Sequence, residues 1–331
     1  MERSSWESGL SVIIPAYNQG NYLADCVKSI RKCGVNDAEV IIVDDGSTDD
    51  TPEMIRSMEG VKYVRQVNQG LPTARNNGFA ISSGEYLLFL DSDDRMLPGM
   101  AARVVGLFER HKEVDVIFGD ALMGNDAEGY ESWIETYGGK DFFDIPHSKA
   151  ERGFRVFAGK DLLRRMAIIN PVITNGTFMR RSAFMKSGMF DTERTGSEDW
   201  ELWMRMAAKG MKFGYVEEKL SVYTRHVDSM SADKDYMIKG FCVTLGKILG
   251  KMELSLDTAE REFFVKRKKE LSLYYTYLAF DRGDLAEARS RLLWRGSFQG
   301  WDAKGLLYFV ASFAPLGVVA AARRLKGRLK Q

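Results

Sequence analysis

Residues 86–94 read Tyr-Leu-Leu-Phe-Leu-Asp-Ser-Asp-Asp, five apolar residues followed at once by three aspartates and one serine. The apolar run has the length of a buried β-strand. In a parallel sheet covered by helices, ligands bind just beyond the carboxyl ends of the strands. This stretch therefore predicts a central strand that brings carboxylates to a ligand site.

Four further apolar runs of strand length lie in the first 120 residues: Leu10–Ile14, Val40–Val43, Val61–Val64 and Val114–Phe118. Helical patterns separate them, as in residues 23–30, where apolar side chains recur at i, i+3, i+4 and i+7. Strands that alternate with helices predict an α/β fold with a mostly parallel sheet covered on both faces.

The remaining chain divides into three parts. Residues 121–190 show no clear alternation and are expected to form an elaborated loop region. A helix at Glu198–Lys209 and a strand at Phe213–Val216 follow, and the pattern is helical from Asp235 to the end. Within it, residues 277–288 are typical of two helices joined at a glycine turn. We therefore expect one domain over 1–234, with halves 1–120 and 121–234, and a helical region over 235–331.

The composition excludes several classes of protein. The formal net charge is +1 with 28% charged residues, which does not favour a nucleic-acid-coating protein. Three cysteines without Cys-x-x-Cys spacing exclude a disulfide framework and a cysteine zinc site. The first residues lack the apolar stretch of a secretory signal. These features favour a cytoplasmic location.

A second group of aspartates follows the strand at residues 40–43, and it contains Asp44, Asp45 and Asp49. Carboxylates that gather at one sheet edge repel one another unless a cation neutralises them, and an all-oxygen set favours Mg²⁺ or Mn²⁺. Residues 44–49 could instead form only a turn and a helix cap.

The order of the motifs resembles glycosyltransferase family 2. The motifs are Val-Ile-Ile-Pro-Ala-Tyr-Asn at 12–18, the strand and Asp-Asp-Gly-Ser-Thr-Asp over 39–49, Asn-Gln-Gly at 68–70, Ala-Arg-Asn at 74–76, Asp-Ser-Asp-Asp at 91–94, Gly-Met-Phe-Asp at 188–191 and Gly-Ser-Glu-Asp-Trp at 196–200. The resemblance covers residues 10–230. It implies the A-type glycosyltransferase fold, which is Rossmann-like with a mostly parallel central sheet, here with an α-helical C-terminal extension. Residues 1–120 would then form the nucleotide-sugar-binding half and residues 121–234 the acceptor-side half.

The resemblance also implies roles for individual residues. Tyr17 would stack on the nucleobase and Asp45 would accept a base N–H, which fits uracil; a core aromatic is the alternative for Tyr17. The nucleotide-binding residues implied are Pro15, Tyr17, Asn18, Asp44, Asp45, Gly70, Arg75, Asp91 and Ser92. Asp93 and Asp94 would bind Mn²⁺ or Mg²⁺. The sequence does not show which of the carboxylates at 91, 93 and 94 touches the ion directly.

Two further segments complete the implied site. His226 matches the histidine of the family's Tyr-Arg-x-His-x-x-Ser-x-Ser motif and would approach the metal, although Thr224 replaces the usual arginine. Asp199 would be the general base of an inverting transfer, with Glu198 and Trp200 on the acceptor side. The alternative for Glu198 and Asp199 is that they only favour a helix N-terminus.

The predicted function is transfer of one sugar from a nucleoside diphosphate sugar, with UDP as the expected nucleotide, to a glycan or lipid-linked acceptor in bacterial cell-surface polysaccharide synthesis. The chain lacks the Gln-x-x-Arg-Trp motif of processive synthases, Gly-x-Gly-x-x-Gly after the first strand and a P-loop. A sugar-phosphate nucleotidyltransferase and a catalytically weak nucleotide-binding scaffold are the alternatives.

The C-terminal segment has a composition of its own. Residues 306–322 are apolar apart from Ser312, and Arg323, Arg324, Lys326, Arg328 and Lys330 follow. An apolar segment followed by a basic one suits an anionic membrane surface on the inner face of the plasma membrane. The alternative is a helical pair that packs on its own domain or forms a homodimer.

Overall fold

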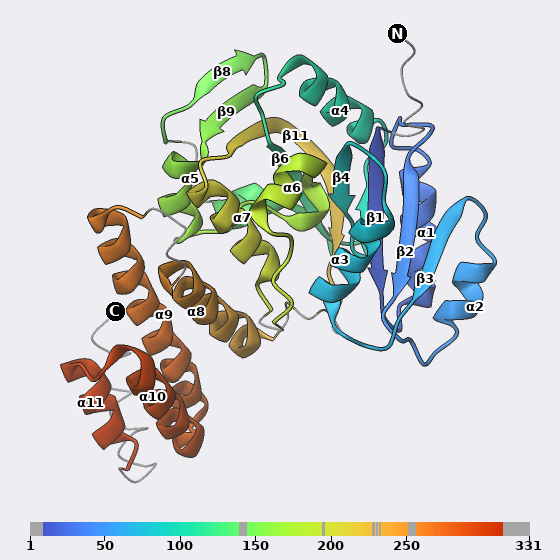
Figure 1. Cartoon of the computed structure of the whole chain (residues 1–331). Helices are drawn as coiled ribbons and strands as arrows, with labels where there is room; N and C mark the ends of the chain where they lie inside the picture. Colours follow the sequence, from blue (N-terminus) through green and yellow to red (C-terminus); the bar gives the residue numbers. More distant parts are fainter. Residues whose placement is uncertain are drawn as a thin grey trace.

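The computed structural model describes residues 9–138, 144–193, 196–226, 229, 231, 233–250 and 256–313. One large sheet with helices on both faces forms the main body, and the helices that follow residue 234 extend from one side of it (Figure 1). The α/β class with a helical C-terminal region is confirmed.

The described part of the chain forms one sheet of eleven strands in the order β3-β2-β1-β4-β10-β6-β11-β9-β8, with β5 paired to β11 and β7 to β6. Their bounds are β1 Leu10–Ala16, β2 Glu39–Asp44, β3 Val61–Arg65, β4 Tyr86–Phe89, β5 Arg95–Met96, β6 Val116–Asn125, β7 Gly129–Ser132, β8 Ser148–Glu151, β9 Phe154–Ala158, β10 Thr177–Arg180 and β11 Lys212–Thr224. Strands β3, β2, β1 and β4 pair in parallel, as do β6 and β11. All five strands expected in the first 120 residues are present.

The helices are α1 Gly20–Ile30, α2 Thr51–Arg56, α3 Leu71–Ile81, α4 Met100–Arg110, α5 Gly159–Met166, α6 Arg181–Ser187, α7 Glu198–Ala208, α8 Lys234–Gly250, α9 Thr258–Arg282, α10 Leu285–Gln299 and α11 Ala303–Ala311. A single turn of π-helix spans Ile134–Gly138 and a 3₁₀ turn spans Thr174–Gly176.

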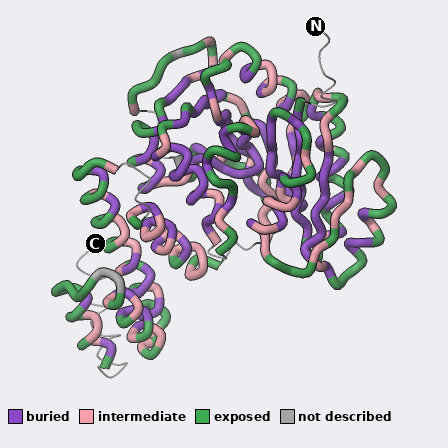
Figure 2. The backbone as a smooth tube through the Cα atoms, viewed as in Figure 1, coloured by how far each residue is buried: buried purple, intermediate pink, exposed green. Residues whose placement is uncertain are grey.

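Alternation along the central strands produces two cores. Val12 and Ile14 of β1 pack with Leu23 of α1 and Val104 of α4, whereas Ile13 packs in the other core with residues of α3, α5 and α7. Successive side chains of a strand point to opposite faces, so an unbroken apolar run can bury both faces. The central strands are accordingly buried along their length, while the outer helix surfaces are exposed (Figure 2).

The expectation of a loop region at 121–190 is wrong, because helices and strands fill most of its described part. Strand β10 lies antiparallel between β4 and β6 in the middle of the sheet. Strands β7 to β10 have only four or five residues each. So few residues give no reliable periodicity, and the partners of β10 lie far from it in the sequence.

The expected helical region after residue 234 is confirmed as far as residue 311. Helix α9 ends at Gly283, whose φ of 83° is left-handed, and the carboxylate of Asp284 caps α10. Residues 314–331, with the basic segment and part of the apolar one, lie outside the described residues. No described helix is long and apolar enough to cross a membrane.

Two glycines inside helices should respond oppositely to alanine. A Cβ on Gly78 of α3 would overlap Ile13 and lie 3.1 Å from Val43, so Gly78→Ala should lower the free energy of unfolding by about 1–3 kcal/mol. A Cβ on Gly106 of α4 would meet only the end of the Arg110 side chain, at 3.3 Å. Gly106→Ala should therefore raise stability by about 0.5–1 kcal/mol. Urea unfolding of both variants tests this, and equal shifts would contradict the packing described.

Candidate active site

A cavity of about 1260 Å³ opens at the carboxyl ends of β1, β2 and β4. The first half of the chain lines it with Pro15, Tyr17, Asp45, Gly70, Arg75, Asp91, Asp93 and Asp94. The second half adds Glu198, Asp199 and His226. Residues that are up to about 200 positions apart in the sequence thus share one cavity, because parallel strands end at the same edge of the sheet.

Tyr17 and Asp45 lie in the same part of this wall. The Tyr17 side chain is 47% exposed, so its ring is accessible from the cavity. Asp45 is buried, and its carboxylate accepts hydrogen bonds from the backbone N–H groups of Gln69 and Gly70, both at 2.7 Å, and from the Gln66 side chain at 2.8 Å. Asp45 therefore fixes the loop before α3, and one of its four acceptor positions has no partner among these three donors.

Asp93 and His226 form a close pair. The distance between Asp93 Oδ2 and His226 Nε2 is 2.7 Å. The imidazole stacks on Tyr22 of α1 at 5.2 Å between ring centres, and the Gln19 side chain donates to the same Asp93 oxygen at 3.4 Å. The end of β11 and the end of β4 thereby meet at this pair.

Asp94 lies behind that pair and is almost fully buried. Its carboxylate accepts hydrogen bonds from Asn175 Nδ2 at 2.6 Å and from the Thr224 backbone N–H at 2.9 Å. Burial, together with the negative charges of Asp93 and Asp91, raises the pKa of Asp94 well above its usual range. Burial and the neighbouring carboxylates thus both disfavour the charged form of Asp94.

Arg75 connects the two halves of the site. Its guanidinium is 2% exposed and lies 2.7 Å from Asp91 Oδ1 and 2.9 Å from Glu198 Oε1. It also packs over the ring of Phe190, with 5.2 Å to the ring centre. With both terminal nitrogens paired, Arg75 orders two carboxylates in addition to lining the cavity.

Asp199 stands at the start of α7, facing the same cavity. Its carboxylate accepts hydrogen bonds from Thr174 Oγ1 at 3.2 Å and from the Trp200 backbone N–H at 2.7 Å. Burial and the neighbouring negative charge of Glu198 raise the pKa of Asp199 to about 6. A carboxylate with this pKa is ionised at neutral pH and basic enough to accept a proton.

Four residues expected in the site do not line the cavity. Asp44 is buried, and its carboxylate accepts hydrogen bonds from the Ser47 N–H and the Tyr63 hydroxyl. Neighbouring residues at a strand end point in opposite directions, so Asp45 faces the cavity and Asp44 does not. Ser92 lies in the turn that follows β4, and its hydroxyl donates to the Gln19 side chain.

The other two belong to a turn and to the core. The Asn18 side chain accepts a hydrogen bond from the Thr48 N–H at 2.8 Å and stabilises a turn. Trp200 is buried, and its indole N–H donates to the Met166 carbonyl at 2.7 Å.

The structure adds cavity residues that the sequence analysis did not identify. Gln19, Trp133, Thr174, Asn175 and Phe241 are among them. Gln19 directly follows the Pro-Ala-Tyr-Asn motif, so its position could have been expected. The others come from the region taken as a loop and from α8, where the sequence carries no signal of a shared site.

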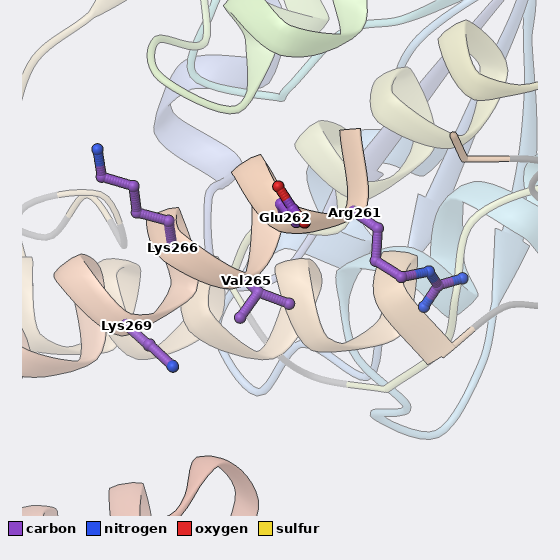
Figure 3. Close-up of a pocket in the computed structure, with 5 residues that line it drawn as sticks. All are labelled: Arg261, Glu262, Val265, Lys266 and Lys269. Carbon is purple, nitrogen blue, oxygen red and sulfur yellow. The ribbon is translucent and has the colours of Figure 1, made fainter. Parts of the chain in front are cut away.

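A second hollow, of about 500 Å³, lies along α9 and is lined by Arg261, Glu262, Val265, Lys266 and Lys269. Figure 3 shows that these side chains spread in different directions and do not converge on one point. All five are exposed, and they include a single carboxylate and no histidine. The candidate active site is therefore the larger cavity.

The sequence matches the model of the family described as Glycosyl transferase family 2 over residues 11–188. This match covers more than half of the chain, and the chain belongs to this family. The glycosyltransferase GlyG of Streptococcus pneumoniae serotype 4 is 33% identical over 138 residues, which are 40% of this chain and 45% of GlyG. The chain thus spans less than half the length of this curated relative.

Solved structures show the same fold. The structure of S. aureus TarS 1-349 in complex with UDP-GlcNAc has a TM-score of 0.57 at 16% identity, covering 95% of this chain and 91% of that one. The mannosyltransferase PcManGT from Pyrobaculum calidifontis, in complex with GDP-Man and Mn²⁺, has a TM-score of 0.56 at 15% identity, covering 97% and 88%. The expected A-type glycosyltransferase fold is therefore confirmed.

Removal of the Arg75 guanidinium should destabilise the protein strongly. Arg75→Met leaves Glu198 buried without its charge partner, which should lower the free energy of unfolding by about 3–5 kcal/mol. Arg56→Met breaks the ion pair between Arg56 and Glu53, in which the two side chains are 54% and 69% exposed. This variant should change the free energy of unfolding by less than about 1 kcal/mol. Urea unfolding monitored by circular dichroism compares the two, and similar losses would show that the Arg75 pairs are not structural.

Proposed function

We propose that this chain transfers one sugar from a nucleoside diphosphate sugar to an acceptor hydroxyl, with inversion at the anomeric carbon. The observation that carries this proposal is the position of Asp199, a carboxylate with a pKa of about 6 that faces the same cavity as the Asp93–His226 pair and Tyr17. One cavity thus combines a proton acceptor with groups suited to a nucleotide and its diphosphate.

The donor would bind along the ends of β1 and β2. The exposed ring of Tyr17 offers a stacking surface for a base, and Asp45 keeps an acceptor position towards a base N–H, which favours uracil. The named neighbours bind UDP-GlcNAc and GDP-Man, which supports a nucleoside diphosphate sugar as the donor class. We expect a UDP-sugar.

Asp93 and His226 would hold a divalent cation, Mn²⁺ or Mg²⁺. Within the described residues, no three His, Cys, Asp or Glu side chains form a ready-made metal site. Two protein ligands are nevertheless a suitable set, because Mg²⁺ usually binds one or two protein groups and completes its shell with substrate phosphates and water. Asp91, Asp93 and Asp94 all line this cavity, and such a group of carboxylates fits a divalent ion. When bound, the cation supplies Lewis-acid stabilisation of the diphosphate leaving group.

The chain's own residues would carry the proton transfer. Thr174 and the Trp200 N–H orient the Asp199 carboxylate, which accepts the proton of the acceptor hydroxyl. The hydroxyl oxygen then bonds to the anomeric carbon while the bond from that carbon to the diphosphate oxygen breaks. A single displacement of this kind inverts the anomeric configuration. Arg75 keeps the adjacent Glu198 charge paired.

The acceptor would be a glycan or a lipid-linked sugar of the bacterial cell surface, reached from the cytoplasm. Helix α11 supports contact with a membrane, because Leu306, Leu307, Val310 and Phe313 on and beside it are 55–68% exposed. The basic residues at 323–330 follow in the sequence. Exposed apolar side chains that are followed in the sequence by cations fit an anionic lipid surface.

Asp199→Asn should lower the kcat for nucleoside diphosphate release by about 10²–10⁴-fold, because the amide cannot accept the proton. Binding of UDP, measured by thermal shift, should stay unchanged. Release is measured with UDP-glucose, UDP-galactose and UDP-N-acetylglucosamine, with Mn²⁺ or Mg²⁺ and after chelation, which should abolish it. In the wild type, activity should rise with pH through about 6 and level off above it, because Asp199 acts when ionised.

The matched control is Asp25→Asn, which alters an exposed carboxylate on α1 and should leave kcat unchanged. If the wild type bound none of these nucleotides, or if Asp199→Asn kept full activity, the proposed function would be wrong.

The full chain should sediment with vesicles that contain phosphatidylglycerol and less with vesicles of phosphatidylcholine alone. Leu307→Gln combined with Phe313→Gln should weaken binding, whereas Met185→Gln on α6, at a residue that is 60% exposed, should not. A chain that remains in the supernatant and elutes as a dimer would favour the homodimer instead.

A further inference from the structure

Helix α8 contacts the segment that leads into α7 at several points. At the start of this segment, Lys247 Nζ lies 3.0 Å from Asp191 Oδ2. Further along, the ring of Tyr236 covers Gly196 so closely that a Cβ on this residue would overlap it, and Gly196 also has a left-handed φ of 75°. The path of the chain just before Glu198 therefore follows the surface of α8.

The contacts continue into the first turn of α7. Ser197 and Thr244 share a hydrogen bond between their hydroxyl groups at 2.8 Å, and both residues are buried. Next to it, Trp200 packs edge-on against Phe241, with 4.9 Å between ring centres. Asp199 lies between Ser197 and Trp200, so both of its flanking anchors contact α8.

The hydrogen bond of Ser197 is unusual for its place in the helix. Ser197 is the N-cap residue of α7, where a serine hydroxyl commonly accepts from an N–H of the first turn. Here the side chain makes no capping bond and pairs with Thr244 instead. The orientation at the start of α7 thus depends on a tertiary contact with α8 in place of a local one.

We infer that α8 is the element that positions Asp199 for catalysis, with Thr244 as the main positioning residue. This rests on the proposed function, in which Asp199 is the general base. Proton transfer requires the carboxylate within hydrogen-bond reach of the acceptor hydroxyl, and displacements near 1 Å can cost about a hundredfold in rate. Thr244 does not line the cavity. It would act on Asp199 through its hydrogen bond with Ser197.

The position of α8 in the cavity supports this role. Tyr236, Met237 and Phe241 line the cavity, so the same helix that holds the start of α7 also forms part of the wall beside Asp199. Residues on both sides of the domain boundary expected between 234 and 235 therefore line the same cavity. The helical region takes part in the site through its first helix.

Thr244→Val removes the hydroxyl while keeping the shape of the side chain, and it should lower the kcat of UDP release by about tenfold or more while the KM for the UDP-sugar changes less than about twofold. Thr244→Ser retains the hydroxyl and should restore most of the rate. The assay uses the full chain with Mn²⁺ and the three UDP-sugars named above.

Thr276→Val is the matched control. Thr276 is also buried in a helix of the C-terminal region, but its hydroxyl donates to Ser272 within its own helix at 3.1 Å. This variant should keep the wild-type kcat. A merely structural role of Thr244 predicts equal effects in both valine variants and equal changes in kcat and KM, and this result would overturn the inference.

Hydrogen exchange separates this inference from the proposed function. Peptides that cover residues 196–203 should exchange faster in Thr244→Val than in the wild type and in Thr276→Val. Unchanged exchange there, in an enzyme that binds UDP and releases it from the sugar, would refute the positioning by α8 alone. A wild type that neither binds UDP nor releases it would refute the proposed function, and the role of Thr244 with it.

Discussion

The buried guanidinium of Arg75 is the interaction on which the arrangement of the site depends. Asp91 follows β4 and Glu198 begins α7, and the chain between them is long enough to place them anywhere. The partly exposed carboxylate of Asp91 and the buried one of Glu198 repel one another unless a cation lies between them. Because both terminal nitrogens of Arg75 are paired and its side chain is nearly inaccessible, Arg75 fixes the spacing between the end of β4 and the start of α7. An unpaired charge in that position would be strongly destabilising.

Around Arg75 and its two partners, the other carboxylates at this edge of the sheet divide into two kinds. Asp44 does not line the cavity, whereas Asp45 and Asp94 line it and also accept hydrogen bonds from the protein that fix the strand ends. Asp93 and Asp199 remain turned to the cavity, one beside His226 and the other beside Thr174. The cluster of acids is therefore only partly a binding site, and much of it is scaffold for the few groups that face a ligand.

The helical region takes part in this scaffold. The strand ends place Tyr17, Asp45 and Asp93, since three neighbouring parallel strands finish at one edge. The start of α7 is not placed by the end of a strand. Helix α8 supplies a packing surface there. Ser197 could have capped α7, but its hydroxyl forms a hydrogen bond with Thr244 of α8 instead. Asp199, the proposed general base, is thereby held at the start of α7 by tertiary contacts from both the sheet side and the helical side.

The sequence by itself determined the alternating strands and helices of the first 120 residues, because apolar periodicity is a local property that a run such as residues 86–90 displays in full. With the family resemblance, it also located Tyr17, Asp93, Asp199 and His226 in one cavity. The tertiary structure alone decided that β10 lies between β4 and β6, that Asp45 faces the cavity and Asp44 does not, and that Thr244 bonds to Ser197. These features depend on register and on contacts between distant segments, which arise only when whole surfaces pack together.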